Sequence, residues 1–208
     1  MGPTASGKTS LAIDLHESLP LEIISVDSVM VYKGCDIGSA KPTKDILLQH
    51  PHHLIDCVDP ESIFTVADFH KKSIELIDKI HKKNKVPFFV GGSMMYFNSL
   101  LNGLDSLPKR DEAYRLELEK LKKNEGIESL YSTLLQKDAL YAAKVKSSDT
   151  QRIIRALEVI KVTGETFTSQ IGNIKTNIFS DKYNLHQYAI YDEDRTCLLY
   201  TSDAADDL

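Results

Sequence analysis

The sequence predicts an α/β fold, in which helices cover both faces of a parallel sheet and a helical subdomain is inserted into the chain. Three observations lead to this prediction. Residues 2–9 carry a phosphate-binding loop motif that runs directly into a helical pattern. Short apolar runs then alternate with helical patterns as far as residue 102, which is typical of a parallel sheet. Between residues 109 and 182 helical patterns dominate and strand signals are few.

The first half of the chain supplies the elements of the sheet. A helix that starts at Lys8 is predicted to end at Pro20, which cannot continue it. Apolar residues recur at helical spacing after Val66, and two short runs rich in Ile, Val and Phe have the length of buried strands. The predicted elements, in order, are a helix at 8–19, a strand at 21–28, a loop at 32–43, a helix at 66–83, a strand at 86–92 and a helix at 93–102.

The second half predicts helices and one return to the sheet. Residues 111–171 suggest several helices, of which Asp149–Thr163 has the clearest apolar face and a capping Asp149. His186–Tyr191 has a strand-like pattern. We therefore expect a discontinuous P-loop NTPase-like core over residues 1–108 and 183–195, with a helical insertion over 109–182.

The two ends of the chain do not fit a complete domain of this kind. A phosphate loop normally follows a strand, so we expect the first strand of the sheet to be missing. Residues 196–208 show no clear period and end in an acidic run, and resemble translated sequencing-library adapter. We expect truncation at both ends, with residues 196–208 as a foreign tail.

Bulk composition narrows the class of protein. The 208 residues are 42% apolar and 26% charged, as in soluble globular proteins, and no apolar run is long enough to span a membrane. We expect a cytoplasmic protein, since no signal segment opens the chain, and we expect it to be a monomer. Cys35, Cys57 and Cys197 suggest neither a disulfide framework nor a zinc site. Net charge is −5, but residues 109–182 hold 14 Lys and Arg against 11 Asp and Glu, a weak sign of RNA binding.

The strongest motif is the P-loop, G-x-x-x-x-G-K-S/T, in which glycines let backbone N–H groups wrap around a phosphate. The helix that follows adds the positive end of its dipole, Lys8 adds a mobile charge, and the Thr9 hydroxyl is suited to ligate Mg²⁺. The motif reports a di- or triphosphate ligand and leaves the reaction open. Its residues are Gly2, Pro3, Thr4, Ala5, Ser6, Gly7, Lys8 and Thr9.

Two further candidates follow predicted strands, at the edge where open parallel sheets bind ligands. Asp27 lies at the carboxyl end of the predicted strand at 21–28, where a carboxylate suits binding of Mg²⁺ or a ribose, or acceptance of a proton; the structural alternative is a loop-forming Asp beside Ser28. Ser93 follows Gly91 and Gly92, and is equally suited to substrate contact or helix capping. The strand at 86–92 ends in no acidic residue, which argues mildly against nucleotide hydrolysis.

Taken in order, the blocks GPTASGKT, SVDS, DIGSAKP, PHHLIDCVDP, VADF, VGGSMMY, DTQRIIRALEV and HQYAI resemble the tRNA dimethylallyltransferase family from Gly2 to about Ile190. The resemblance implies transfer of a dimethylallyl group from dimethylallyl diphosphate to the N6 amine of a tRNA adenosine adjacent to the anticodon. It implies that the P-loop holds the diphosphate with Mg²⁺ at Thr9, and that Lys8, Thr9 and Asp27 are catalytic, Asp27 as the general base. The insertion would bind tRNA, and the implied tRNA contacts are Asp27, Ser28, Val29, Met30, Ser93, Arg115, Gln151, Arg152, Ile153, Ile154 and Arg155.

Three alternatives stay open. A small-molecule P-loop kinase would explain the first motif and the α/β pattern, but not the later blocks, and it would require ATP. The related adenylate isopentenyltransferases, which act on AMP, ADP or ATP, share the first blocks. A nucleotide- or RNA-binding module with a vestigial P-loop is a non-catalytic alternative, against which the intact Lys8, Thr9 and Asp27 argue.

Overall fold

The structure, a computed structural model, describes residues 1–172 and 179–190. The chain divides into two compact units, each of which is described by itself. The core unit comprises Met1–Asn102 and the segment from Ile178 onward, and the helical unit comprises Gly103–Asn177. The predicted tail at 196–208, and Cys197 within it, lie outside the described residues. In the part of the chain that is described, no helix is both long and apolar enough to cross a membrane.

A parallel three-stranded sheet is the centre of the core unit, with strand order β2-β1-β3. β1 (Leu21–Val26) and β3 (Val86–Gly91) pair along their full length, with Leu21 opposite Val86 and Val26 opposite Gly91. The short β2 (His52–His53) lies on the other side of β1 and was not predicted. All six residues of β1 are buried, as the apolar run predicts for the central strand of a parallel sheet.

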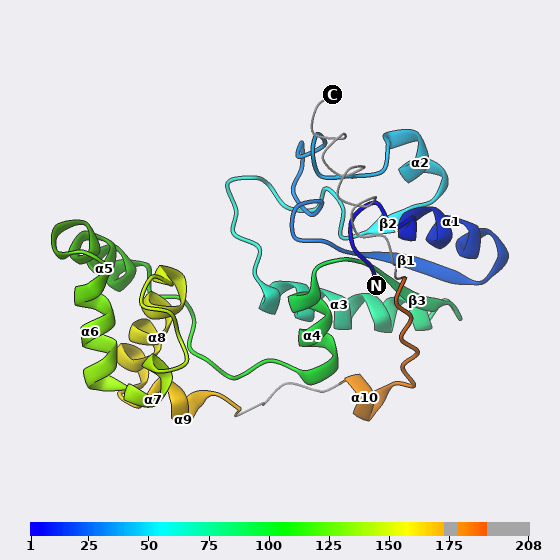
Figure 1. Cartoon of the computed structure of the whole chain (residues 1–208). Helices are drawn as coiled ribbons and strands as arrows, with labels where there is room; N and C mark the ends of the chain where they lie inside the picture. Colours follow the sequence, from blue (N-terminus) through cyan, green and yellow to red (C-terminus); the bar gives the residue numbers. More distant parts are fainter. Residues whose placement is uncertain (173–178, 191–208) are drawn as a thin grey trace. The chain divides into compact units, whose positions relative to one another are not determined.

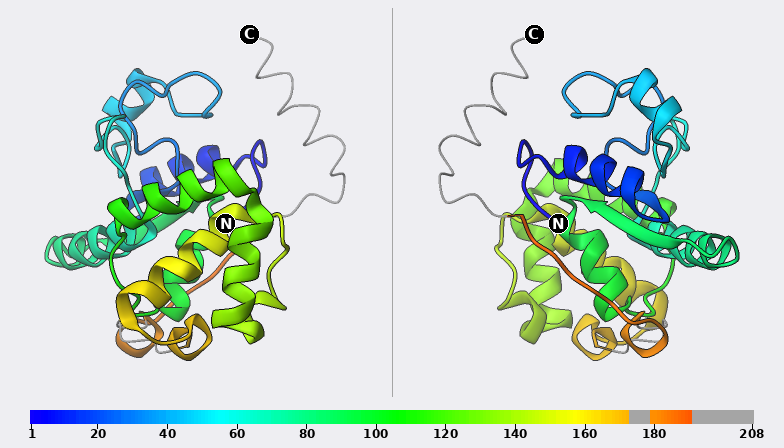
Figure 2. Two further views of the ribbon diagram at one scale, coloured as in Figure 1. Left: turned by 90° about the vertical axis from the view of Figure 1, so that its left-hand side faces the viewer. Right: turned by 90° about the vertical axis from the view of Figure 1, so that its right-hand side faces the viewer.

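Helices pack on both faces of this sheet, which confirms the predicted fold class (Figures 1 and 2). On one face, Ala12 of α1 (Lys8–Ser18) contacts side chains of β1 and β3. The other face is covered by α3 (Val66–His81) and α4 (Met94–Asn102). A capping box, in which Thr65 and Asp68 each bond the other's backbone N–H, starts α3 where the apolar pattern begins. Two short helices, α2 (Lys44–Gln49) and α10 (Phe179–Lys182), complete the unit.

The predicted strand at His186–Tyr191 is wrong for residues 186–190, which form no strand, and Tyr191 lies outside the described residues. This segment instead runs beside the first residue of the chain. The Ile190 N–H donates to the Met1 carbonyl at 2.8 Å, and the Met1 amino group donates to the Tyr188 carbonyl at 2.8 Å. Two hydrogen bonds beside a single residue do not make a ladder. The first residues of the chain also contact β3, where the Gly2 N–H donates to the Gly91 carbonyl at 3.3 Å.

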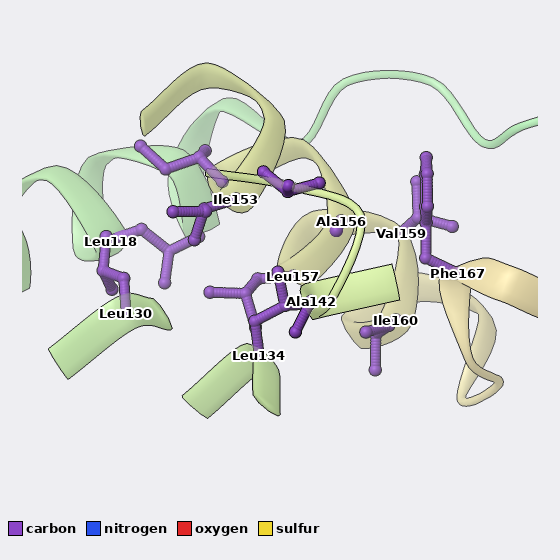
Figure 3. Close-up of a cluster of buried hydrophobic side chains, with 12 residues drawn as sticks. Leu118, Leu130, Leu134, Ala142, Ile153, Ala156, Leu157, Val159, Ile160 and Phe167 are labelled. Carbon is purple, nitrogen blue, oxygen red and sulfur yellow. The ribbon is translucent and has the colours of Figure 1, made fainter. Parts of the chain in front are cut away.

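The helical unit is built around α8 (Thr150–Thr163), whose predicted cap is confirmed: the Asp149 carboxylate accepts from the Arg152 N–H at 3.1 Å. Ile153 and Leu157 are 0% and 1% exposed, at the centre of a cluster to which every helix of the unit contributes (Figure 3). The α8 pattern of apolar residues therefore forms the core of this unit. The surrounding helices are α5 (Glu112–Glu125), α6 (Ile127–Lys137), α7 (Ala139–Ala142) and α9 (Phe167–Gln170).

Candidate active site

The P-loop wraps around the start of α1, as its sequence predicts. Gly7 precedes the helix in the left-handed conformation (φ 74°), and Ala5 adopts a similar backbone (φ 63°). The loop is braced from within, because the Ser6 hydroxyl donates to the Pro3 carbonyl at 2.8 Å and the Lys8 ammonium donates to the same oxygen at 2.6 Å. Gly7 provides no side chain to cap the helix, so the first backbone N–H groups of α1 are available to an anion.

A cavity of about 340 Å³ opens beside this loop, at the carboxyl ends of β1 and β3. Its lining includes most of the P-loop, with Lys8 and Thr9, together with Asp27 after β1 and Gly91 at the end of β3. The structure therefore brings the P-loop and Asp27, the two strongest candidates from the sequence, into one site. The cavity also has lining residues from β2 and from the loops on either side of α2 and β2, which were not predicted: Ser39, Ala40, Pro42, His52 and Ile55.

Asp27 is oriented by the backbone that follows it. Its Oδ1 accepts from the Val29 N–H at 2.8 Å and from the Met30 N–H at 3.1 Å, while Oδ2 accepts no hydrogen bond from any residue that the structure describes. Asp27 is thus a loop-forming aspartate, as the structural alternative predicts, and it also lines the cavity. Burial lowers the pKa of the Lys8 ammonium below its ordinary value, and the nearby Asp27 carboxylate acts against that shift.

The end of β3 is packed tightly against β1. A Cβ added to Gly91 would lie 2.1 Å from the Val26 carbonyl oxygen, so only glycine fits there. Two residues later, the Ser93 N–H donates to the same oxygen at 3.2 Å, and the Ser93 hydroxyl accepts from the Ser28 N–H at 3.1 Å. Ser93 therefore holds the segment after β1 in place, and is not among the residues that line the cavity.

Within the helical unit, two of the arginines predicted to bind tRNA surround a buried carboxylate. Glu158 is 0% exposed, and its Oε2 lies 2.7 Å from Nη1 of Arg155 and 3.7 Å from Nη2 of Arg115. Its Oε1 accepts from the Asp111 N–H at 2.6 Å, and Arg155 also donates to the Pro108 carbonyl at 2.8 Å. These contacts join the start of α5 to α8. The signal in the sequence was the position of Glu158, one turn after Ile154 and therefore on the apolar face of α8.

The remaining residues of the predicted tRNA-binding segment differ in exposure. Gln151 and Arg152 are exposed, and Arg152 pairs with Asp149 at 3.4 Å. Ile153 and Ile154 are 0% and 1% exposed, and their side chains pack in the core of the unit; Figure 3 shows Ile153 there. Consecutive helical residues point in different directions, so a contiguous segment cannot contact a ligand with every side chain.

Fold and cavity together define a P-loop-like α/β protein with a cavity at the carboxyl edge of its sheet. The model of the family described as IPP transferase matches residues 30–201. The chain therefore belongs to the IPP transferase family. It is 46% identical over 191 residues to a tRNA dimethylallyltransferase of Acinetobacter baumannii strain ATCC 17978. The aligned region covers 91% of this chain and 60% of that relative.

Two solved structures are similar to the chain. One is a eukaryotic dimethylallyltransferase, described in crystallographic snapshots as acting on tRNA. It matches with a TM-score of 0.79 at 26% identity, over 99% of this chain and 50% of its own. The full-length tRNA isopentenylpyrophosphate transferase of Bacillus halodurans is 43% identical, with a TM-score of 0.49, over 79% of this chain and 55% of its own. The chain thus spans about 60% of the length of the relative that it matches.

Proposed function

We propose that the protein transfers the dimethylallyl group of dimethylallyl diphosphate to the N6 amine of an adenosine adjacent to the anticodon in tRNA. The observation that carries this proposal is the single cavity that the P-loop and Asp27 share. One end of it presents Lys8 and backbone N–H groups to a diphosphate, and a carboxylate oxygen without a hydrogen bond among the described residues stands in the same space. Relatives named for this reaction, with which the chain shares its family, support the choice of donor and acceptor.

In the proposed reaction the amine nitrogen forms a bond to C1 of the prenyl group, and the bond between C1 and the diphosphate oxygen breaks. The electron pair leaves with the diphosphate, where Lys8 and the first N–H groups of α1 stabilise the added charge. The amine loses one proton, which Oδ2 of Asp27 accepts. Because its Oδ1 is held by Val29 and Met30, the carboxylate keeps one orientation toward the amine.

The donor set fits a magnesium ion that the substrate carries in. No group of three or more His, Cys, Asp or Glu side chains suited to a metal occurs in the described part of the chain. Mg²⁺ in phosphate sites is commonly held by phosphate oxygens and water with one or two protein ligands, and Thr9 and Asp27 both line the cavity. We propose that the Thr9 hydroxyl would be the protein ligand of such an ion, which would supply positive charge beside the diphosphate.

For the acceptor, the base must leave its stack to reach a cavity of this kind. Ser28 and Val29 are exposed beside Asp27 and belong to the proposed contact with the base. Arg152, whose side chain is 68% exposed, is the best placed residue of α8 to contact a phosphate. Arg115 and Arg155 form ion pairs with Glu158, so we propose that they shape the surface of the helical unit as well as contributing charge.

The test supplies Mg²⁺ and labelled dimethylallyl diphosphate with either tRNA or AMP, and compares the chain with its Asp27→Asn variant. The variant keeps the shape of the side chain but removes its negative charge. Label on tRNA, absent from AMP and reduced at least about 100-fold in the variant, is the expected result for loss of a general base. The Acinetobacter baumannii relative under the same conditions checks the RNA and the donor. Label on AMP would point to the adenylate-prenylating class. In a parallel reaction with added ATP, consumption of ATP without prenyl transfer would point to a kinase.

A further inference from the structure

Lys41 has a buried ammonium group in a loop beside the candidate active site. Its side chain is 3% exposed, although lysine side chains are rarely buried. Its Nζ lies 2.7 Å from Oδ1 of Asp36, 2.7 Å from Oδ1 of Asp56 and 3.0 Å from the Tyr32 carbonyl oxygen. All three of its N–H donors therefore have partners. Burial alone would lower the pKa of Lys41, but the hydrogen bonds and charges of Asp36 and Asp56 raise it above its ordinary value.

These contacts cross-link two segments that are far apart in sequence. Tyr32, Asp36 and Lys41 belong to the loop before α2, whereas Asp56 follows β2. The two segments also meet through the backbone, where the Asp56 N–H donates to the Met30 carbonyl at 3.1 Å and Lys33 N–H to the Val58 carbonyl at 2.9 Å. The two-residue β2 forms few ladder hydrogen bonds with β1. The Lys41 ammonium adds further contacts between the loop before α2 and the segment after β2.

The backbone at this junction is strained. Ala40, Leu54 and Asp56 all have positive φ, at 52°, 64° and 50°, in the left-handed region that L side chains rarely adopt. Two of these three residues flank or contact Lys41 directly. Conformations of this kind persist only where surrounding contacts hold them. The Lys41 cluster supplies such contacts at the position where the chain turns toward the cavity.

The residues next to the cluster form part of the apolar lining of the cavity, which also includes Met30 and Val90. Ala40 and Pro42 are the chain neighbours of Lys41, Ile55 is the neighbour of Asp56, and all three line the cavity. The polar P-loop is the place for the diphosphate, so the carbon chain of a prenyl donor requires an apolar region of the same cavity. The segments that Lys41 joins provide one.

We propose that Lys41 is a positioning residue, which holds Ala40, Pro42 and Ile55 as the wall that receives the five-carbon chain of the donor. This inference rests on the proposed function, because it assigns a subsite for that donor. Lys41 does not line the cavity, and it acts through its neighbours. Removing its charge leaves the P-loop untouched, so the two halves of the donor should respond differently.

The experiment measures the affinity of the whole chain for two Mg²⁺-loaded diphosphate esters by titration calorimetry. Dimethylallyl diphosphate carries the carbon chain, and methyl diphosphate keeps the ester and the charge without it. Burial of a methylene gives about fourfold in affinity, so half-burial of the four additional carbons should make wild type prefer the prenyl ester by about 15-fold. Lys41→Met should lower this preference about tenfold and leave the affinity for methyl diphosphate unchanged.

Further variants separate positioning from general damage. Lys41→Arg keeps the charge and should restore part of the preference. Asp36→Asn removes the negative charge of one half-exposed partner of Lys41, and should give a preference for the prenyl ester between those of wild type and Lys41→Met. This variant tests the role of Lys41 even where Lys41→Met does not fold. Lys33→Met, which removes an exposed ion pair with Asp59 in the same loop, should behave as wild type.

Each outcome decides a different point. A wild type that binds neither ester, or that shows no preference for the prenyl ester, would overturn the proposed function itself. A preference that survives in both Lys41→Met and Asp36→Asn would overturn only the role of Lys41. An equal loss of affinity for both esters would also overturn it, because a positioning role for the apolar wall predicts that diphosphate binding is kept.

Discussion

Replacing Glu158 by glutamine tests what holds the helical unit together. The substitution keeps the shape of the side chain, but one carboxylate oxygen becomes an amide NH₂. Both oxygens are in use, since Oε1 accepts from the Asp111 N–H and Oε2 faces Arg155 and Arg115. A glutamine can therefore satisfy the backbone or the arginines, and it turns an N–H donor toward the other.

The magnitude follows from these contacts. Breaking a fully buried ion pair by removing one charge costs about 3–5 kcal/mol. The side chains of Arg155 and Arg115 are 30% and 22% exposed, so water screens part of the loss. A glutamine oxygen also keeps one of the hydrogen bonds, each worth about 1.5–3 kcal/mol when a charged group takes part. We expect Glu158→Gln to destabilise the helical unit by about 2–3 kcal/mol.

Urea unfolding followed by far-ultraviolet circular dichroism measures this loss, because the helical unit is rich in helix. Glu117→Gln is the matched control, since Glu117 is exposed on α5 and should change stability by less than about 0.5 kcal/mol. A loss below about 1 kcal/mol for Glu158→Gln would refute the reasoning that its charge joins α5 to α8. A loss equal to that of the control would mean that packing alone holds the two helices.

Three more changes test the core unit. Gly91→Ala should abolish stable folding, because its Cβ would lie 2.1 Å from the Val26 carbonyl oxygen, and the soluble yield and circular dichroism spectrum would show it. Glu22 is buried, and Lys83 among other cations outweighs burial to lower its pKa from 4.5 to about 2. Its contribution is therefore complete above about pH 5 and lost as the pH falls toward 2; at pH 6 but not at pH 2, Glu22→Gln should cost on the order of 2 kcal/mol in urea unfolding. Thr65→Ala removes the capping box of α3 and should cost about 1 kcal/mol in thermal unfolding.

Local patterns were enough to predict much of the core unit. The predicted helix at 8–19 is found at Lys8–Ser18, and the predicted strand at 86–92 is found at Val86–Gly91. Each of these depends on the spacing of apolar residues along a single segment, which the sequence displays directly. The P-loop and Asp27 could be placed at one edge of the sheet because parallel strands end on the same side.

Features that depend on distant partners were not visible in the same way. Lys41 gave no signal, because one of its two carboxylates lies 15 residues further along the chain and meets it only after folding. The two-residue β2 is too short for any periodic pattern, and it forms because β1 offers it a ladder. Arg155 was correctly expected near the start of α8, but its pairing with the buried Glu158 required knowledge of how α5 packs.

The start of α1 has a consequence for how the protein responds to its substrate. The helix begins after Gly7 with no side-chain cap, and its first turn contains no acidic residue. Leu11 is the first residue whose N–H is bonded within this turn, to the Gly7 carbonyl at 3.1 Å. In the part of the chain that the structure describes, the amides of residues 8–10 donate to no protein group. A phosphate bound there, as proposed, should change them from fast to slow hydrogen exchange. The first turn of α1 would therefore complete its hydrogen bonds only with the ligand in place. The exchange rates of these few amide protons would report how much of the site is occupied.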